Sequence, residues 1–248
     1  MLEFYYKFVY TSNDFNIFQL AVITPCFNPP KSWVENYIHS CKSIENLLNI
    51  ADIAWILVND GSLQSIDQDS ISQIQQSLKN FSYFPLVKNQ GKGFATRYGV
   101  QQVEAAAYIY TDIDFPYKNE DFVKVYQAVA KGNDLVIAVR SAQYYEQISK
   151  SRTWISQRFK SIVKLLFKIP TTDTQAGLKG LSRAGREVLL QTTVNQYLFD
   201  LELVKLAAKK DLRIKEVSVK LKEGITLTDV SYKILFTELL NLFKILFS

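Results

Sequence analysis

Between residues 20 and 140, short and continuously apolar segments alternate with segments whose apolar residues recur with the period of a helix. Continuous apolar runs are typical of parallel strands that helices cover on both faces. We expect strands at 20–24, 53–58, 83–87, 107–111 and 134–139, and helices at 33–50, 67–80, 94–105 and 121–130. The alternation predicts an α/β fold with a largely parallel central sheet flanked by helices.

The alternation changes after residue 140. A long basic helix is expected at about 151–168, a mixed segment at 171–190, a helix at 197–210, a strand at 212–219 and an apolar helix at about 230–247. No repeat or linker interrupts the sequence, so we predict a single domain over 1–248. Its first half, about 20–140, would bind a ligand, and its second half, about 141–222, would complete the site.

The composition narrows the class of protein. Hydrophobic residues make up 48% of the chain and charged residues 21%, which is typical of a folded globular protein. A formal charge of +5 fits either a solvated basic surface or attraction to phosphates or an anionic membrane, and we expect no nucleic-acid partner. Two cysteines indicate a reducing compartment, and a single histidine argues against a zinc site or a serine hydrolase. We recognise neither a signal peptide nor an apolar run long enough to span a membrane.

Polar and conformationally special residues follow each expected strand. They lie at 25–30, 59–62, 89–93 and 112–116 and at Arg140. In open parallel sheets, ligands bind beyond the carboxyl ends of the strands. We therefore expect the functional site at this edge of the sheet.

Two carboxylates, Asp112 and Asp114, end the fourth expected strand. Alternate residues of a strand point the same way, so both side chains can face one site. Two negative charges this close are unfavourable without a positive partner, and Mg²⁺ or Mn²⁺ is the natural one. The alternative is a solvated acidic turn before Pro116, but the position at the end of a buried strand favours the metal.

A glycine-rich turn with a lysine, residues 89–93, lies between the third expected strand and the next helix. A helix beginning near Gly93 would offer free N–H groups to an anion, and Lys92 and Arg97 would add positive charge. The Walker pattern is absent, and Thr96 replaces the third glycine of a dinucleotide fingerprint. A nucleotide-cofactor oxidoreductase and a purely structural turn remain as alternatives.

Seven segments, in chain order, resemble those of family 2 glycosyltransferases with the GT-A fold. They are 22–28, 58–62, 89–99, 112–114, 173–180, 199–202 and 216–219. The similarity runs from about residue 20 to residue 222, and it is greatest to the dolichyl- and polyprenyl-phosphate glucosyl- and mannosyltransferases. The resemblance implies a GT-A fold whose first half binds a nucleotide sugar.

The resemblance also implies roles for single residues. Asp112 and Asp114 would hold the metal and the donor, Arg140 would lie near the phosphates, and Lys220 would approach a donor or acceptor phosphate. With the cations of the glycine-rich turn included, the residues predicted to bind the nucleotide sugar are Pro25, Phe27, Asn28, Asn59, Asp60, Lys92, Arg97, Asp112 and Lys220. The residues predicted to act in catalysis are Asp114, Arg140, Asp173 and Asp200.

Three positions depart from the family pattern. An acidic residue usually stands at the position of Pro29, an aspartate at that of Asn59 and a glutamine at that of Pro116. These differences bear on how the donor is bound. They leave open the alternative of a GT-A-like binding protein without activity.

The expected reaction is the inverting transfer of a hexose from a UDP-sugar to a polyprenyl- or dolichyl-phosphate acceptor. The likeness of segment 173–179 favours the UDP donor. A lipid phosphate is already ionised near neutral pH, so it needs no general base. The alternative acceptor is a sugar hydroxyl in glycan synthesis, which would need a base, and Asp173, Asp200 and Glu202 are the candidates.

Four cations, Arg152, Lys160, Lys164 and Lys168, form one stripe of the expected helix 151–168, beside an apolar face. A basic amphipathic helix is typical of a membrane-surface element, and the alternative is a helix that packs on the sheet with a basic edge. The apolar segment 230–247 would dock on a membrane, on a second copy of the chain in a homo-oligomer, or on sequence beyond residue 248. We expect peripheral attachment at the cytoplasmic face of a membrane.

Overall fold

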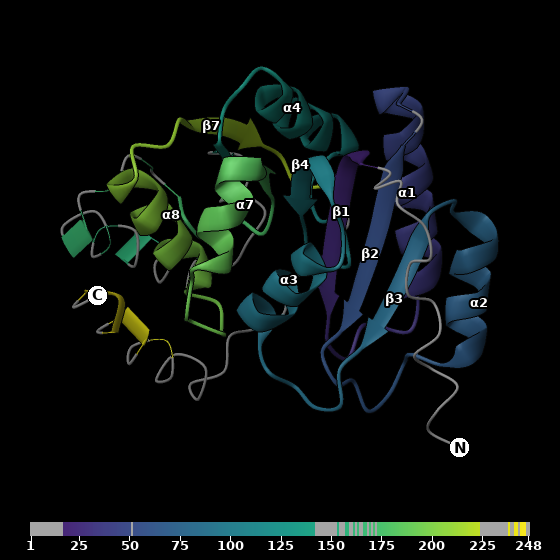
Figure 1. Cartoon of the computed structure of the whole chain (residues 1–248). Helices are drawn as coiled ribbons and strands as arrows, with labels where there is room; N and C mark the ends of the chain where they lie inside the picture. The colour runs from purple at the N-terminus through teal and green to yellow at the C-terminus, as the bar shows by residue number, and fades with distance from the viewer. Residues whose placement is uncertain are drawn as a thin grey trace.

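A seven-stranded sheet forms the centre of the protein (Figure 1). The computed structural model describes residues 17–50, 52–141 and 173–223, with individual residues between 153 and 171 and between 238 and 246. The strand order is β3-β2-β1-β4-β6-β5-β7, and only β6 of these runs antiparallel to its neighbours. The strands are β1 (Phe18–Cys26), β2 (Ile53–Asn59), β3 (Phe81–Pro85), β4 (Ala105–Tyr110), β5 (Leu135–Arg140), β6 (Lys179–Ser182) and β7 (Ile214–Val219).

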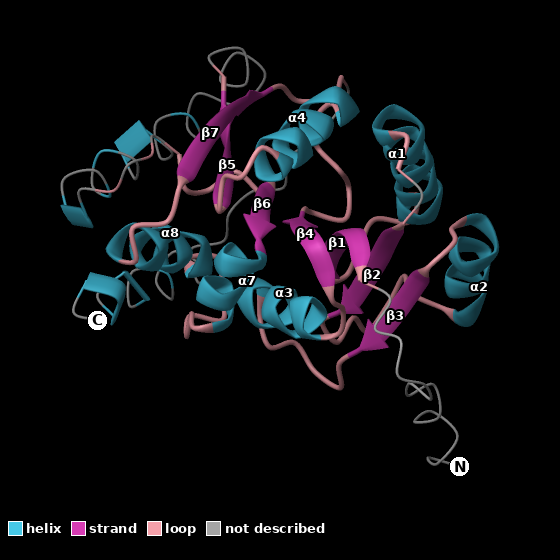
Figure 2. Cartoon of the chain, turned by 45° about the horizontal axis from the view of Figure 1, so that its top comes forward, coloured by secondary structure: helices cyan, strands magenta, loops and turns pink. Residues whose placement is uncertain are grey.

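Helices cover both faces of the sheet (Figure 2). One layer contains α1 (Trp33–Leu48), α2 (Gln68–Ser77) and α4 (Asn119–Ala130), and the other contains α3 (Lys92–Gln101), α7 (Arg183–Leu190) and α8 (Phe199–Lys209). Side chains alternate along a strand, so β1 contributes to both cores. Leu20 and Val22 face the first layer, and Ala21 and Ile23 face the second. This arrangement confirms the predicted α/β fold with a largely parallel sheet.

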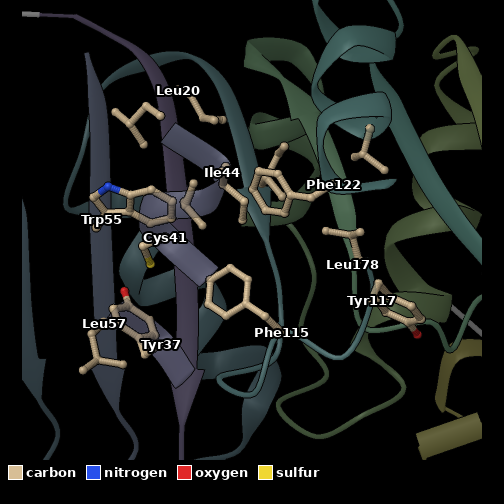
Figure 3. Close-up of a cluster of buried hydrophobic side chains, with 14 of the residues drawn as sticks. Leu20, Tyr37, Cys41, Ile44, Trp55, Leu57, Phe115, Tyr117, Phe122 and Leu178 are labelled. Atoms are coloured by element: carbon tan, nitrogen blue, oxygen red, sulfur yellow. The ribbon is translucent and has the colours of Figure 1, made fainter. Parts of the chain in front are cut away.

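Aromatic rings fill the core between α1, α4 and the sheet (Figure 3). The ring of Tyr37 packs edge-on against that of Phe115, with centroids 5.7 Å apart. Phe115 follows β4 and has a left-handed φ of 44°, which is uncommon for a residue with a bulky side chain. Burial of its ring therefore fixes the conformation of the turn that contains Asp112 and Asp114.

The chain reverses its direction across the sheet between β1 and β4. From β1 it passes to β2 and β3 on one side, and then returns to β4 on the other side of β1. Such a reversal is a topological switch point, where ligands bind in open α/β sheets. The residues that follow β1 and β4 therefore lie at the place where a ligand is expected.

The strands and helices predicted between residues 20 and 140, the helix predicted at 197–210 and the strand predicted at 212–219 are present, with shifted ends. The third strand is Phe81–Pro85 instead of 83–87, because its pairing with β2 ends where Pro85 lies opposite Asn59. The following helix is Lys92–Gln101 instead of 94–105, and β4 begins at Ala105, which pairs with Phe18 of β1. Alanine and valine fit either element, so an apolar run at a helix–strand junction does not define its own boundary.

The four cations of the predicted basic stripe lie outside the described residues. The described residues of 153–167 and 238–246 are helical. Leu242 and Ile245 are buried in the same core as α8, so part of the apolar face of segment 230–247 packs on the domain itself. Among the described residues, no helix combines the length and the apolar character needed to cross a bilayer.

Candidate functional site

Hydrogen bonds join the loops that follow β1, β2 and β3. The N–H of Asp60 donates to the carbonyl of Cys26 at 2.7 Å. The Asp60 carboxylate accepts from the N–H groups of Gln90 at 2.7 Å and Gly91 at 2.8 Å. Burial raises the pKa of Asp60, and these two N–H donors oppose the rise. Asp60, predicted to contact the nucleotide, therefore also fixes the glycine-rich turn to the end of β2.

Two asparagines, Asn28 and Asn59, form hydrogen bonds with the loop that follows β2. Asn59 donates to the hydroxyl of Tyr83 at 2.9 Å and accepts from the N–H of Ser62 at 2.8 Å. The side-chain amide of Asn59 thus uses both its donor and its acceptor at the position where the family often has aspartate. Asn28 receives a hydrogen bond from the N–H of Leu63 at 3.2 Å, and its own N–H donates to Ser62 at 2.9 Å.

Of the first predicted nucleotide contacts, Asn28 is exposed, and so is the aromatic ring of Phe27. Its exposed fraction is 49%, whereas Pro25 is buried within β1. Phe27 follows the last residue of β1, at the switch point of the sheet. An exposed aromatic ring at this position is suited to stacking against a base.

The carboxylates of Asp112 and Asp114 lie in a turn directly after β4. The N–H of Phe115 donates to the carbonyl of Asp112 at 3.0 Å and closes the turn. Asp112 forms an ion pair with Lys92, and its side chain is 38% exposed. Burial, and then the charge of Asp112, raise the pKa of Asp114 to about 6, while Lys92 and Lys222 act in the opposite direction.

The pair is suited to a divalent cation that also binds a ligand's oxygens. Among the described residues, no group of three or more histidine, cysteine, aspartate or glutamate side chains gathers at one place. Mg²⁺ is usually bound by one or two carboxylates together with phosphate and water oxygens. The turn after β4 supplies two such carboxylates, and the Asp112 side chain is 38% exposed. Asp112 and Asp114 therefore fit the predicted metal.

The amino end of α3 is capped by the protein, contrary to the anion site expected there. The carbonyl of Asn195 accepts from the N–H groups of Gly93 at 2.7 Å and Phe94 at 3.3 Å. A Cβ atom at Gly91 would overlap the same carbonyl oxygen, so only glycine permits this approach. The free N–H groups that a phosphate would use are thus occupied by a segment about 100 positions further along the chain.

Arg97 also holds the segment that caps α3. Its guanidinium donates to the hydroxyl of Thr192 at 3.0 Å, to the carbonyl of Val194 at 2.8 Å and to the side chain of Asn195. Glu202 secures the same segment by accepting from the N–H groups of Thr193 and Val194, both at 2.8 Å. Arg97 thus fixes segment 192–195, a contact that its predicted role as a positive charge for the donor did not include.

Arg140 and Asp173, both predicted to act in catalysis, form one buried unit. Nε of Arg140 lies 2.6 Å from Oδ2 of Asp173, and Nη2 lies 2.7 Å from Oδ1. Asp173 is 1% exposed and also accepts from the N–H of Gln175 at 3.1 Å. Two parallel hydrogen bonds between planar groups fix the orientation of the guanidinium at the end of β5.

Asp200 lies in a second buried unit that sequence reasoning did not find. The hydroxyl of Tyr110 donates to Asp200 at 2.5 Å, and Nζ of Lys179 lies 3.0 Å from the same oxygen. Lys179 is fully buried. One feature of the sequence could have indicated this unit. Lys179 lies in the buried strand β6, where an unpaired charge would be unfavourable.

Besides Lys92, Lys222 acts on Asp114, and it lies two positions after Lys220, which the resemblance implies would approach a phosphate. Lys220 has an exposed side chain, and its N–H donates to Asp121 at 2.8 Å. Nζ of Lys222 lies 5.8 Å from the ring centroid of Phe115, and its charge lowers the pKa of Asp114. The N–H of Lys222 donates to the carbonyl of Pro116 at 2.9 Å, which ties the segment after β7 to the carboxylate turn.

Known proteins resemble the chain over most of its length. The family model described as glycosyl transferase family 2 matches residues 21–189. The dolichyl-phosphate beta-glucosyltransferase of Saccharomyces cerevisiae is 26% identical over 188 residues, which cover 68% of this chain and 56% of that protein. The human protein of the same name is 27% identical over 220 residues, covering 83% of this chain and 68% of its own length. The chain thus spans about half to two thirds of these two relatives.

Solved structures share the fold at lower identity. Glucosyl-3-phosphoglycerate synthase from Mycobacterium tuberculosis, solved with Mn²⁺, UDP and glucosyl-3-phosphoglycerate, superposes with a TM-score of 0.62 at 16% identity, over 88% of this chain and 75% of that one. Mannosyl-3-phosphoglycerate synthase from Rubrobacter xylanophilus gives 0.64 at 14% identity, over 92% and 73%. The fold is that of the GT-A glycosyltransferases. With more than half of its residues matched by the family model, the chain belongs to glycosyl transferase family 2.

Proposed function

We propose that the chain transfers a hexose, with inversion, from a UDP-sugar to a polyprenyl- or dolichyl-type lipid phosphate. The observation that carries the proposal is the pair Asp112 and Asp114 at the switch point of a family 2 fold. The names of the relatives, dolichyl-phosphate beta-glucosyltransferases, support the glucosyl donor and the lipid-phosphate acceptor.

The donor would lie across the ends of β1, β2 and β4. Phe27 would stack on the base, and the loops that Asp60 joins would enclose the nucleoside. Asp112 and Asp114 would hold Mg²⁺ or Mn²⁺, which stabilises the departing diphosphate by neutralising its charge. Arg140, oriented by Asp173, would place a fixed positive charge beside the phosphates.

The three carboxylates considered as general bases already bind other protein groups, which supports a phosphate acceptor. Asp173 binds Arg140, Asp200 binds Lys179 and Tyr110, and Glu202 binds segment 193–194. A general base must lie within hydrogen-bond reach of the proton that it removes, and all three carboxylates are buried. An ionised phosphate requires no such group, whereas a sugar hydroxyl does.

The test compares acceptors that differ only in the phosphate. The full chain is incubated with Mn²⁺, with UDP-glucose or GDP-mannose, and with a short-chain polyprenyl phosphate or the polyprenol of the same length. We expect a β-linked glycolipid from UDP-glucose and the phosphate alone. Transfer to the polyprenol would support the hydroxyl-acceptor alternative. Binding of UDP without release of UDP from UDP-glucose would support an inactive binding protein.

Peripheral attachment to a membrane is the second part of the proposal. The net charge of +5 supports attraction to an anionic surface, and the basic stripe of 151–168 would provide the contact. The chain should sediment with phosphatidylserine vesicles at low salt and be released at high salt. A chain that stays in the supernatant at every ionic strength would contradict this part of the proposal.

A further inference from the structure

A buried ion pair joins β6 to α8 beneath the candidate site. Lys179 is 0% exposed and Asp200 is 4% exposed, and Nζ of Lys179 lies 3.0 Å from Oδ1 of Asp200. The hydroxyl of Tyr110 donates to that oxygen at 2.5 Å. A buried charge pair is weak evidence for added stability, because removing two charges from water offsets their attraction. We therefore ask what the pair does for the carboxylates of the candidate site.

Lys179 reaches from this pair to the wall of the candidate metal site. Its Nζ donates to the carbonyl of Ala176 at 2.8 Å and so fixes the Ala176–Gly177 peptide. Gly177 packs against the carboxylate of Asp112, where even a Cβ atom would overlap Oδ2. The ammonium of Lys179 therefore determines the surface against which Asp112 rests.

Asp200 is linked to Asp112 by way of Lys179. Its Oδ1 lies 3.0 Å from Nζ of Lys179, and the same ammonium holds the Ala176 carbonyl next to the glycine that packs against Asp112. Asp112 also forms an ion pair with Lys92.

We infer that Asp200 and Lys179 are positioning residues for Asp112, and that Asp200 is not a general base. The inference rests on the proposed function, in which Asp112 holds the divalent cation. Asp200 has no direct access to an acceptor, because its described contacts are the buried groups Tyr110 and Lys179. Its role is to hold the ammonium of Lys179, and through it the 176–177 peptide, in place against the Asp112 carboxylate.

The test measures Mn²⁺ binding directly, by the electron paramagnetic resonance of free Mn²⁺ during titration of the full chain in the presence of UDP. The variants are Asp200→Asn, which keeps the size of the side chain, and Lys179→Met. Lys205→Met is the matched control, because Lys205 lies on α8 but donates to the carbonyl of Ile245 at 2.5 Å, away from the carboxylates. Steady-state kinetics at increasing Mn²⁺ accompany each titration.

We expect Asp200→Asn and Lys179→Met to weaken Mn²⁺ binding about 10- to 100-fold, as the loss of groups that orient metal ligands does. The kcat of Asp200→Asn should recover at saturating Mn²⁺, and Lys205→Met should bind Mn²⁺ as the wild type does. If Lys179→Met does not fold, Tyr110→Phe replaces it, and a smaller weakening of Mn²⁺ binding is expected.

Unchanged Mn²⁺ affinity in Asp200→Asn, with a low kcat that Mn²⁺ does not restore, would overturn the inference and identify Asp200 as a base. Unchanged affinity and kcat in the variants would overturn it as well. A wild-type chain that binds no Mn²⁺ with UDP present would contradict the proposed function, and the inference with it. The two failures are therefore distinguishable.

Discussion

The ammonium of Lys222 donates a hydrogen bond of 3.0 Å to the hydroxyl of Ser40, although 182 positions separate the two residues in the chain. Ser40 lies on α1, whereas Lys222 follows β7, the edge strand of the sheet that lies opposite β3 in the strand order. The contact brings a cation from the second half of the chain to the carboxylate turn of the first half. The site thus depends on both halves of the domain.

Replacing Lys222 by methionine should raise the KM for the phosphate-bearing substrates about tenfold or more, because hydrogen bonds to charged groups contribute about 1.5–3 kcal/mol. It should also raise the apparent pKa of Asp114, since the charge of Lys222 lowers it. Steady-state kinetics over a range of pH measure both effects. Lys220→Met is the matched control, with an exposed side chain two positions away, and equal effects in the two variants would refute the assignment to Lys222.

Replacing Gly177 by alanine should displace the carboxylate of Asp112, because the added Cβ overlaps Oδ2. We expect donor turnover to fall about 10- to 100-fold, as for other changes that misorient a metal ligand. The control is Gly132→Ala, which introduces strain at a φ of 93° but meets only the flexible end of Arg213. It should lower the melting temperature and leave turnover intact. Full activity of Gly177→Ala would contradict the geometry.

The pH dependence of metal binding should follow Asp114. Burial and the charge of Asp112 raise its pKa to about 6, so the folded protein binds the proton more tightly than the unfolded chain, whose aspartate pKa is about 3.9. For the metal-free protein, this favours folding at low pH, and the contribution is lost as the pH rises from about 4 through about 6.

A cation competes with that proton, so Mn²⁺ affinity should fall as the pH drops below about 6. Calorimetric titrations with Mn²⁺ and UDP between pH 5 and pH 8 test this, and Asp114→Asn should remove the dependence. An affinity that stays constant over this interval in the wild type would show that Asp114 is not a ligand.

Sequence periodicity predicted the sheet because its strands are buried on both faces. Helices cover β1 and β2 on each side, so nearly all of their residues are apolar and the segments are recognisable. The strand-end rule also located Asp60, Asp112 and Asp114, because it depends only on the direction of parallel strands.

Contacts between distant segments could not be predicted in this way. The carbonyl of Asn195 caps α3, and Lys179 pairs with Asp200, through the path of the chain after residue 140. The choice of Lys222 over Lys220 depends on the path of the chain after β7 ends at Val219, because the two lysines meet different partners there. A local pattern contains no information on such partners.

In the proposed site, Asp112 and Asp114 hold a divalent cation that binds the diphosphate of the donor. Calorimetric titration of UDP-glucose into the full chain, once with Mn²⁺ and once with EDTA, tests this for the wild type and for the Asp112→Asn/Asp114→Asn variant. We expect binding only by the wild type with Mn²⁺. Equal binding in EDTA, or Mn²⁺-dependent binding that persists in the variant, would contradict the proposed site.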